Sequence, residues 1–433
     1  MRHRVLSSRR LPARDAIVAA VLSAALLAPS GVAAQQPFEI RIAPGGSLIP
    51  QEARSPGLGY DGTSPYYELI VQAILFVNRG GEPVTVDGAR IDLRRGGASL
   101  QLTEIAPAEM ERAQGTATAI TKEGFATGME VLFAARALIP PGVTIAPTRT
   151  LAPGSAGLVD DTYLVVRALP DTATITVRGR TASGRAVTGR ASFPVRRHAS
   201  RNAYAFPLEA GHWFVLGYPG IKGHHWWTTA TEHGMDITMV DARGSWAAGP
   251  DAAWREGSVP RWEDWYAYGK RVLAAADGIV EKVVSDVAFP LDVWNRRAGE
   301  SPDAYHERIG ARQMELFTAP GADPIAVAGG NHVIVRHANG EWTMYGHLAY
   351  GSILVKAGQS VRQGEPLAGV GGTGEEPAVH LHFQVMDGPE PTYARTYPVE
   401  FTNVRVNEHG VERYAPRMVF QSGYFVSVAP AKP

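Results

Sequence analysis

The sequence predicts an all-β protein, in which an N-terminal immunoglobulin-like β-sandwich precedes a second β-sheet domain that carries inserted loops and a short helix. Two observations support this prediction. Short apolar and β-branched runs recur along the 433 residues, and Gly, Pro, Asn and Asp separate them as they do between strands. Helix-like patterns are confined to residues 104–121 and 302–317.

The first 34 residues have the order of a secretory signal peptide. Arginines precede an apolar run at Ile17–Ala28, and small residues at Val32–Ala34 offer a cleavage site. The apolar run is short for a membrane span. We expect cleavage near Ala34 and export to the periplasm, cell envelope or outside medium. Arg9-Arg10 also permits a twin-arginine signal, and an uncleaved anchor is a further alternative.

The composition limits the classes of site and partner. Cysteine is absent, which excludes thiolate metal sites and a cysteine nucleophile, so any metal must be bound by His, Asp or Glu. Lys plus Arg and Asp plus Glu each number 42. Without the five Arg and Asp15 of the first 34 residues, 37 basic and 41 acidic residues remain. This near-neutral balance gives no reason to expect a nucleic-acid partner.

Residues 38–195 are predicted to form the accessory sandwich. A strand at Tyr66–Val77 is followed by a Gly-rich turn and by strands within Val84–Leu93, and a second hairpin covers Ala173–Phe193. Residues 104–121 form one predicted helix between them. No group of His, Asp or Glu here has ligand-like spacing, so a structural spacer and a binding module are both open interpretations. Residues 196–210 are the predicted linker.

The second half, residues 211–390, carries the chemistry, and residues 391–433 are predicted to add C-terminal strands. Val379–Val385 alternates strictly, as expected of a β-strand, in which residues two apart point to the same face. Leu381, Phe383 and Val385 should enter a core, while His380, His382 and Gln384 occupy the other face. Two imidazoles on one face are half of a zinc site, and a pair of surface histidines is the plainer alternative.

Six short motifs accompany that strand in a fixed order. They are Ala-Ala-Asp-Gly at 275–278, Gly-Asn at 330–331, Tyr-Gly-His-Leu at 345–348, Val-Lys-Ala-Gly-Gln at 355–359, Thr-Gly at 373–374 and His-Leu-His-Phe at 380–383. With them, roughly residues 223–385 resemble the lysostaphin-type zinc metallopeptidases. The resemblance implies one Zn²⁺, hydrolysis of peptide bonds in bacterial peptidoglycan cross-links, Asp236 and His382 as metal ligands, and His347 and His380 as the catalytic histidines that do not bind the metal.

The sequence departs from the family pattern at the first ligand. The family has a histidine four residues before the aspartate, where this chain has Glu232. Glu232 itself can supply a carboxylate oxygen, and His233 can serve only on an irregular backbone. His224 or His225 can reach in from upstream, and we favour His225, so that the predicted metal ligands are His225, Asp236 and His382. A broken site is the remaining alternative.

An intact site would have defined chemistry. Two neutral imidazoles and one carboxylate leave a zinc centre of charge +1 with an open position, which acidifies water to a pKa of roughly 7. One of His347 and His380 would accept a proton and the other would bind the oxyanion, in an order that the sequence leaves open. Asn331 is interpreted as a turn residue and Tyr345 as a packing residue. His332 and His337 are interpreted as structural or solvent-facing.

Two insertions distinguish this chain from the family pattern, residues 242–268 and residues 286–328. Long segments between strands often line binding sites. The aromatic set of the first insertion is able to hold a glycan or a peptide, although packing of the loop onto its own core explains most such residues. This set comprises Trp246, Trp254, Trp262, Trp265 and Tyr266.

Three functions are consistent with these features. The first is a zinc-dependent metalloendopeptidase acting on peptidoglycan or another extracytoplasmic peptide, which retention of the aspartate and three histidines favours. The second is a catalytically degenerate relative that binds the wall or activates other hydrolases, which Glu232 favours. The third, a lipoyl- or biotinyl-type carrier hairpin at residues 355–370, lacks an evident modified lysine at its turn. No integral membrane segment is expected after signal removal.

Overall fold

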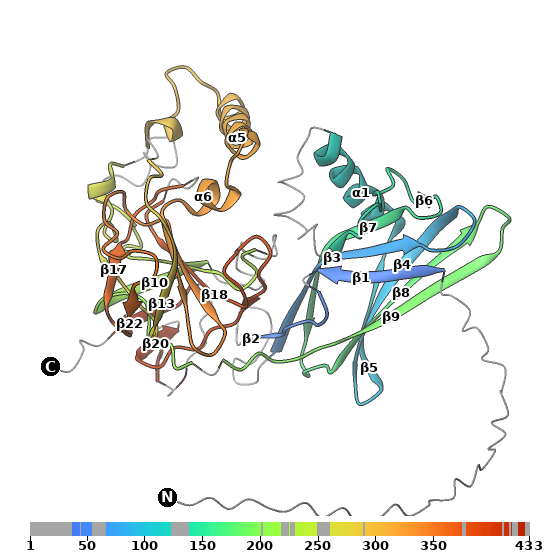
Figure 1. Ribbon diagram of the computed structural model, residues 1–433, viewed down its shortest axis with the longest axis horizontal. Helices are drawn as coiled ribbons and strands as arrows, with labels where there is room; N and C mark the ends of the chain where they lie inside the picture. Colours follow the sequence, from blue (N-terminus) through green and yellow to red (C-terminus); the bar gives the residue numbers. More distant parts are fainter. Residues whose placement is uncertain are drawn as a thin grey trace, which may run out of the picture. The chain divides into compact units, whose positions relative to one another are not determined.

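A computed structural model of the chain contains many strands and few helices, which confirms the predicted all-β fold class (Figure 1). The predicted signal peptide, Trp254 and His224 lie outside the residues that the structure describes. Within the described part, no helix is both long enough and apolar enough to cross a membrane. The described residues are 37–43, 45–53, 66–122, 138–200, 202–217, 225, 230–248, 260–288, 291–374, 378–408, 411–414, 417 and 423–428.

Two antiparallel sheets form the N-terminal sandwich. In the first, the long strand β3 pairs with β1 and β2 along one edge and with β7 along the other. In the second, the order is β5-β4-β8-β9, and β6 also pairs with β4. Apolar residues of both sheets share one buried core, so the predicted strand-turn-strand spacing does produce a sandwich. The strands are β1 (Phe38–Ala43), β2 (Gln51–Ala53), β3 (Tyr66–Asn78), β4 (Val84–Arg95), β5 (Ala98–Ile105), β6 (Thr150–Leu151), β7 (Ala156–Val166), β8 (Thr172–Thr181) and β9 (Ala186–Pro194).

The helix predicted at residues 104–121 is observed as α1 (Pro107–Lys122). Ala117 of α1 packs with Ala73, Leu75 and Leu158, which lie on the opposite face of the first sheet from the sandwich core. The helix therefore covers a sheet face that water would otherwise reach. The immunoglobulin-like character of this domain and its boundaries remain predictions.

An eleven-stranded antiparallel sheet dominates the second half, in the order β16-β13-β14-β15-β18-β11-β10-β22-β20-β21, with β19 also paired to β18. A separate pair joins β12 and β17. The strands are β10 (Gly211–Gly217), β11 (Met235–Thr238), β12 (Arg271–Leu273), β13 (Gly278–Val284), β14 (His332–Arg336), β15 (Trp342–Gly346), β16 (Ser360–Val361), β17 (Pro366–Gly369), β18 (Leu381–Met386), β19 (Thr396–Tyr397), β20 (Val404–Glu408), β21 (Val411–Arg413) and β22 (Phe425–Val428).

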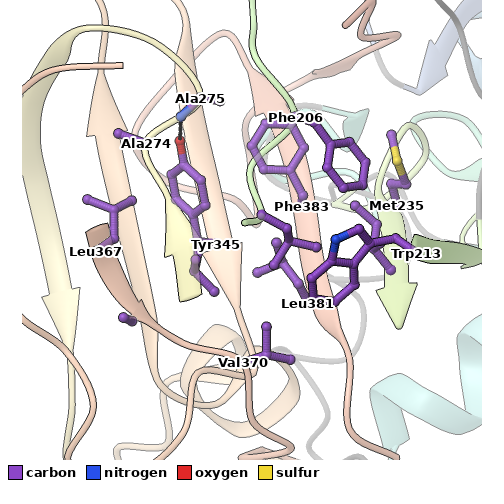
Figure 2. Close-up of a cluster of buried hydrophobic side chains, with 14 of the residues drawn as sticks. Phe206, Trp213, Met235, Ala274, Ala275, Tyr345, Leu367, Val370, Leu381 and Phe383 are labelled. Carbon is purple, nitrogen blue, oxygen red and sulfur yellow. Dashed lines mark hydrogen bonds between the residues drawn. The ribbon is translucent and has the colours of Figure 1, made fainter. Parts of the chain in front are cut away.

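The alternation of the histidine strand is realised in β18. Leu381 and Phe383 are fully buried in the main core, where Phe383 contacts Tyr345 and Trp213 lies nearby (Figure 2). Burying each such side chain stabilises the fold by roughly 1.5–3 kcal/mol. The opposite face of β18 is also covered, because Met386 joins a small second cluster that includes residues of β14, β15 and a short helix, α6 (Pro324–Gly329). The histidine face is thus enclosed rather than exposed to water.

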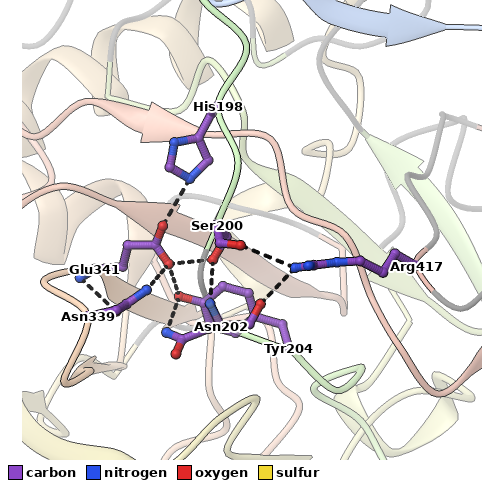
Figure 3. A network of polar contacts seen from close by, with 7 residues as sticks. All are labelled: His198, Ser200, Asn202, Tyr204, Asn339, Glu341 and Arg417. Carbon is purple, nitrogen blue, oxygen red and sulfur yellow. Dashed lines mark hydrogen bonds and ion pairs between the residues drawn. The ribbon is translucent and has the colours of Figure 1, made fainter.

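The predicted linker is partly built into the second domain. Tyr204 and Phe206 are buried in the main core (Figure 2 labels Phe206), and the Tyr204 hydroxyl donates a 2.8 Å hydrogen bond to Glu341. Glu341 follows the β14–β15 turn and also accepts hydrogen bonds from His198, Ser200 and Asn339 (Figure 3). Residues 198–206 are therefore anchored to the second domain by both apolar packing and a carboxylate network.

Helices occur in the second insertion. The helix predicted at residues 302–317 is observed as α5 (Pro302–Thr318), with Ser301 as N-cap and Pro at its first position. A further short helix, α6 (Pro324–Gly329), was not predicted; Asp323 caps its N-terminus by accepting hydrogen bonds from the amides of Ile325 and Ala326. Two 3₁₀ turns, η3 (Trp262–Asp264) and η4 (Leu291–Trp294), lie in the first and second insertions respectively.

Candidate metal centre and catalytic histidines

The centre of the candidate site is a pairing between β11 and β18. Asp236 and His382 are register partners on these antiparallel strands, and Gly346 of β15 flanks His382 on the other side. Side chains of register partners project to the same face of a sheet, so the two groups must meet. Nδ1 of His382 lies 3.1 Å from Oδ1 of Asp236, and both residues are buried.

His225 completes a group of three. Its Nε2 lies 3.1 Å from Oδ2 of Asp236, and its ring packs edge-on to His382 with centroids 4.9 Å apart. One ligand atom from each of His225, Asp236 and His382 lies within 4.8 Å of the other two. Among the described residues, this is the one group of His, Asp and Glu whose atoms converge in this way.

The hydrogen bonds of this group fit a cation. Gln384 Oε1 lies 2.9 Å from Nε2 of His382, and because a carbonyl oxygen only accepts, Nε2 carries the proton. The other nitrogen of the neutral ring, Nδ1, then turns its lone pair toward the Asp236 carboxylate. A lone pair facing a carboxylate at 3.1 Å is stabilised when a cation lies between them. Imidazole and carboxylate are both zinc ligands.

His347 occupies a strained position beside this group. Its φ is +56°, and it is the single non-glycine residue with a positive φ in the described part of the chain. Its backbone N–H donates to Gly329 O at 2.7 Å, and its Nδ1 donates to Thr373 O at 2.8 Å. Two contacts thus fix both backbone and ring. Burial, His380 and His382 hold the pKa of His347 well below its usual value.

His380 is the fifth member of the cluster. Its Nε2 lies 3.4 Å from Oδ1 of Asp236, and its ring centroid is 4.4 Å from that of His347. Its Nδ1 lies 3.2 Å from Ala378 O. The structure therefore brings together all five residues singled out in the sequence, while their roles remain predictions.

Two other candidates for the first ligand, His233 and Glu232, lie outside the converging group. His233 is buried with its backbone N–H and Nδ1 directed at Thr396 Oγ1, at 3.0 and 3.3 Å. Burial lowers the pKa of His233 to about 3, so the ring is neutral. Glu232 is also buried, which raises the pKa of its carboxyl to about 7 against the opposing charge of Arg395. Neither belongs to the converging group.

Several residues interpreted as structural are buried and bonded. Asn331 is more than a turn residue, because its amide exchanges two hydrogen bonds with the Val287 backbone and donates to Leu348 O. Tyr345 packs as expected, with its hydroxyl accepting from Ala275 N–H at 2.8 Å. His332 and His337 are both buried, hydrogen-bonded to Gly330 O and to Asp277 O and Thr343 respectively, which excludes the solvent-facing alternative.

Sequence reasoning missed two supports of the site. Gln384 was placed on the histidine face by alternation, but its hydrogen bond to His382 was not foreseen. Thr373 O, which holds His347, belongs to the Thr-Gly motif at 373–374, which does not by itself predict this contact. In the first insertion, Trp265 is buried and Trp246 packs against the main core, as anchoring predicts. Trp262 also packs against the main core, and in addition it lines a pocket.

Comparison with known proteins finds a family match for part of the second half of the chain. Residues 321–393 match the sequence profile of Peptidase family M23. Peptidoglycan DD-endopeptidase ShyC from Vibrio cholerae is 33% identical over 113 residues, which cover 22% of this chain and 26% of that protein. Cell division protein DipM from Caulobacter vibrioides is 47% identical over 97 residues, covering 21% of this chain and 15% of that protein. The matches thus span about a quarter or less of these relatives.

The solved structures that this chain matches have low overall similarity to it. A zinc containing peptidase from Vibrio cholerae is 13% identical, covers 80% of this chain and 83% of that chain, and gives a TM-score of 0.25. The catalytic domain of lysostaphin from Staphylococcus simulans is 18% identical, covers 43% of this chain and 88% of that chain, and gives a TM-score of 0.22.

The profile match includes His347, His380 and His382, and the motifs on either side of these histidines are those of the lysostaphin type. Residues 321–393 of this chain therefore match Peptidase family M23, and the motifs around them resemble those of its lysostaphin type.

Proposed function

We propose that this protein is a zinc-dependent metalloendopeptidase of the cell envelope that hydrolyses peptide bonds in peptidoglycan cross-links. The observation that carries the proposal is the convergence of His225, Asp236 and His382 on one buried point, with His347 and His380 beside it. Relatives named peptidoglycan DD-endopeptidases support the substrate. The predicted signal peptide supports the location.

His225 Nε2, an Asp236 oxygen and His382 Nδ1 would hold the zinc ion. A zinc ion bound there supplies positive charge that polarises a peptide carbonyl and acidifies water. Gln384 supports this role by fixing the proton of His382 on Nε2, which leaves Nδ1 as the donor atom. The displaced histidine ligand then comes from eleven residues before Asp236 instead of four.

His347 and His380 are proposed to handle protons. Because Nδ1 of His347 donates to Thr373 O, its Nε2 carries the lone pair and accepts a proton from the attacking water. His380 lies in ring contact with His347 and within 3.4 Å of Asp236, where it can hydrogen-bond the oxygen on which negative charge develops. Its hydrogen bonds to Gly329 O and Thr373 O hold the strained backbone and the ring of His347 in this geometry before substrate binds.

Zinc content and hydrolysis, measured separately, test the proposal. Purified protein is stripped with a chelator, reloaded with zinc and assayed for bound metal. We expect about one zinc per chain, with loss in His225→Ala and His382→Ala and retention in the matched controls Glu232→Gln and His233→Gln. His347→Ala and His380→Ala should keep zinc yet lose hydrolysis of purified cross-linked peptidoglycan by about 10²–10⁴-fold.

The outcomes separate the two functions. New amino and carboxyl ends, released only by zinc-loaded protein, support the peptidase. A wild-type protein that holds zinc but releases no new ends, or holds none after zinc is supplied, refutes the peptidase and favours the wall-binding or activating alternative.

A further inference from the structure

A pocket of about 470 Å³ adjoins the candidate catalytic histidine. Ala349 and Tyr350 follow His347 by two and three residues, and Thr373, whose carbonyl holds the His347 ring, also lines the pocket. A group bound in this pocket would therefore lie next to the proposed reaction centre. The seven lining residues are Trp262, Tyr268, Ala288, Ala349, Tyr350, Gly372 and Thr373.

Both insertions contribute to the walls. Trp262 and Tyr268 come from residues 242–268, and Ala288 comes from residues 286–328. These are the segments that distinguish this chain from the family pattern. Three of the seven lining residues thus come from this chain's own additions, and the other four come from residues 349–373.

The aromatic wall is firmly held. The rings of Trp262 and Tyr268 are parallel within 6°, with centroids 6.4 Å apart. Trp262 lies so close to Gly372 that a Cβ there would be 2.5 Å from its Cζ3, so the residue must be glycine. Just after Tyr268, the N–H of Gly269 donates to Val370 O at 2.8 Å, which ties the insertion to the main sheet region. The rings are therefore positioned before any ligand binds.

The uncharged, aromatic lining of the pocket favours the glycan part of peptidoglycan over the peptide part as its ligand. None of the seven lining residues is charged, and three are aromatic, with Tyr350 63% exposed. Cross-linking peptides carry carboxylates and amines, which such walls would leave unpaired. Glycan strands consist of uncharged N-acetylated sugars, whose apolar ring faces stack on aromatic side chains and whose acetyl methyl groups suit small apolar surfaces. With a volume of about 470 Å³, the pocket is also far larger than the side chain of an alanine in a cross-linking peptide, so it suits a bulkier group such as a sugar.

We propose that the Trp262–Tyr268–Tyr350 pocket binds an N-acetylated sugar of the glycan strand that carries the scissile peptide. This inference rests on the proposed function, because it assumes a cell-wall substrate. The sugar would hold the attached peptide next to His347, so the enzyme would prefer cross-links still joined to glycan over free peptides. Substrate selection would then depend on this pocket, to which both insertions contribute, rather than on the metal ligands.

Direct binding tests the pocket without any need for hydrolysis. The probe is a neutral tetramer of N-acetylglucosamine, titrated into the purified full chain in a calorimeter. Wild type should bind it, and Tyr350→Ala and Trp262→Leu should each weaken binding by about tenfold, as expected for loss of one stacking ring. Tyr414→Ala removes a similarly exposed tyrosine, 68% exposed, outside the pocket and should bind as wild type does.

Hydrolysis provides the second measurement. A cross-linked peptide dimer is compared with the same dimer attached to its disaccharides, and Tyr350→Ala should lower the preference for the sugar-bearing dimer, as a ratio of kcat/KM values, by about tenfold. Tyr350 is the safer variant, since its exposed ring contributes little to folding.

Failure of the tetramer to bind wild type, or equal binding by wild type, Tyr350→Ala and Trp262→Leu, would overturn the glycan site. Displacement of the tetramer by the sugar-free peptide would overturn it as well. Sugar binding without cleavage of either dimer would leave the pocket standing and overturn the peptidase.

Discussion

Asp236 and His382 face each other across two antiparallel strands, with Nδ1 of His382 3.1 Å from Oδ1 of Asp236. The pairing register, rather than loop flexibility, therefore sets the distance between two predicted metal ligands. A substitution that moves β11, β18 or the His382 ring should therefore lower the metal affinity before it affects other properties.

Gly234 lies against the His382 ring. A Cβ at residue 234 would be 2.7 Å from Cε1 of His382 and 3.0 Å from Thr231 O, so one of them must shift. We expect Gly234→Ala to lower zinc affinity by about tenfold or more and to destabilise the fold by about 1–3 kcal/mol. A chelator competition titration and a thermal melt measure the two effects.

The matched control is Gly310→Ala. Gly310 lies within helix α5, and a Cβ there would meet nothing within 4 Å. This variant should keep full zinc affinity and gain up to about 1 kcal/mol, because alanine is the better helix former. Equal zinc affinity in the two variants would contradict the proposed place of the metal.

Gln384 positions the His382 ring through a 2.9 Å hydrogen bond to its Nε2. Gln384→Leu removes the oxygen that accepts the Nε2 proton, so the ring can turn or exchange its proton to Nδ1. We expect zinc affinity to fall by about 10–100-fold. Gln384→Glu keeps an acceptor at the same place and should restore most of the affinity. A leucine variant that binds zinc as tightly as wild type would show that the hydrogen bond has no such role.

Glu341 should make stability fall at low pH. Burial acts to raise the pKa of its carboxyl, but hydrogen bonds from His198, Ser200 and Tyr204 outweigh it and lower the pKa to about 2. Since the pKa is 4.5 when unperturbed, the stabilisation is complete above pH 4.5 and is lost as pH falls toward 2. Glu341→Gln should cost about 2 kcal/mol at pH 7, with a difference from wild type that shrinks below pH 4.5 in denaturant titrations.

An exposed carboxylate serves as the comparison for Glu341. Glu412 pairs with Arg405 at the surface, where ion pairs contribute little. Glu412→Gln should leave the free energy of unfolding nearly unchanged both at pH 7 and below pH 4.5. A wild-type-like pH profile for Glu341→Gln would show that the network in Figure 3 does not anchor residues 198–204.

Glu232 should make stability fall as pH rises, which is the opposite of the pH dependence expected from Glu341. Its buried carboxyl has a pKa raised from 4.5 to about 7, so the folded state holds the proton more tightly than the unfolded state. The stabilisation from the protonated form is complete below pH 4.5 and is lost as pH rises through 7. Glu232→Gln cannot ionise and should exceed wild type in stability by about 2 kcal/mol at pH 8.

The same variant tests the ligand assignment. Because Glu232 lies outside the converging group, Glu232→Gln should bind zinc as tightly as wild type. Loss of zinc in this variant would identify Glu232 as a ligand and displace His225 from the site. Zinc content of the dialysed proteins gives the answer directly.

Some features were readable from the sequence because they depend on local patterns. Alternation along Val379–Val385 placed Leu381 and Phe383 in the core and both histidines on the opposite face, since a strand has a side-chain period of two. Helix α5 was recognisable for a similar reason, as Ser301 and Pro302 are a local start signal. The peptidase family was recognisable because its motifs are short contiguous segments in a fixed order.

Other features depended on contacts between distant segments, and only the tertiary structure decided them. The sequence left Glu232, His224, His225 and His233 as alternatives, because chain spacing does not say how a loop returns to a strand. In the structure His233 faces Thr396 and Glu232 lies near Arg395, while His225 meets Asp236. The Trp262 pocket likewise requires backbone approach at Gly372, 110 positions along the chain. Local periodicity determined which faces carry the chemistry, and long-range packing determined which side chains meet there.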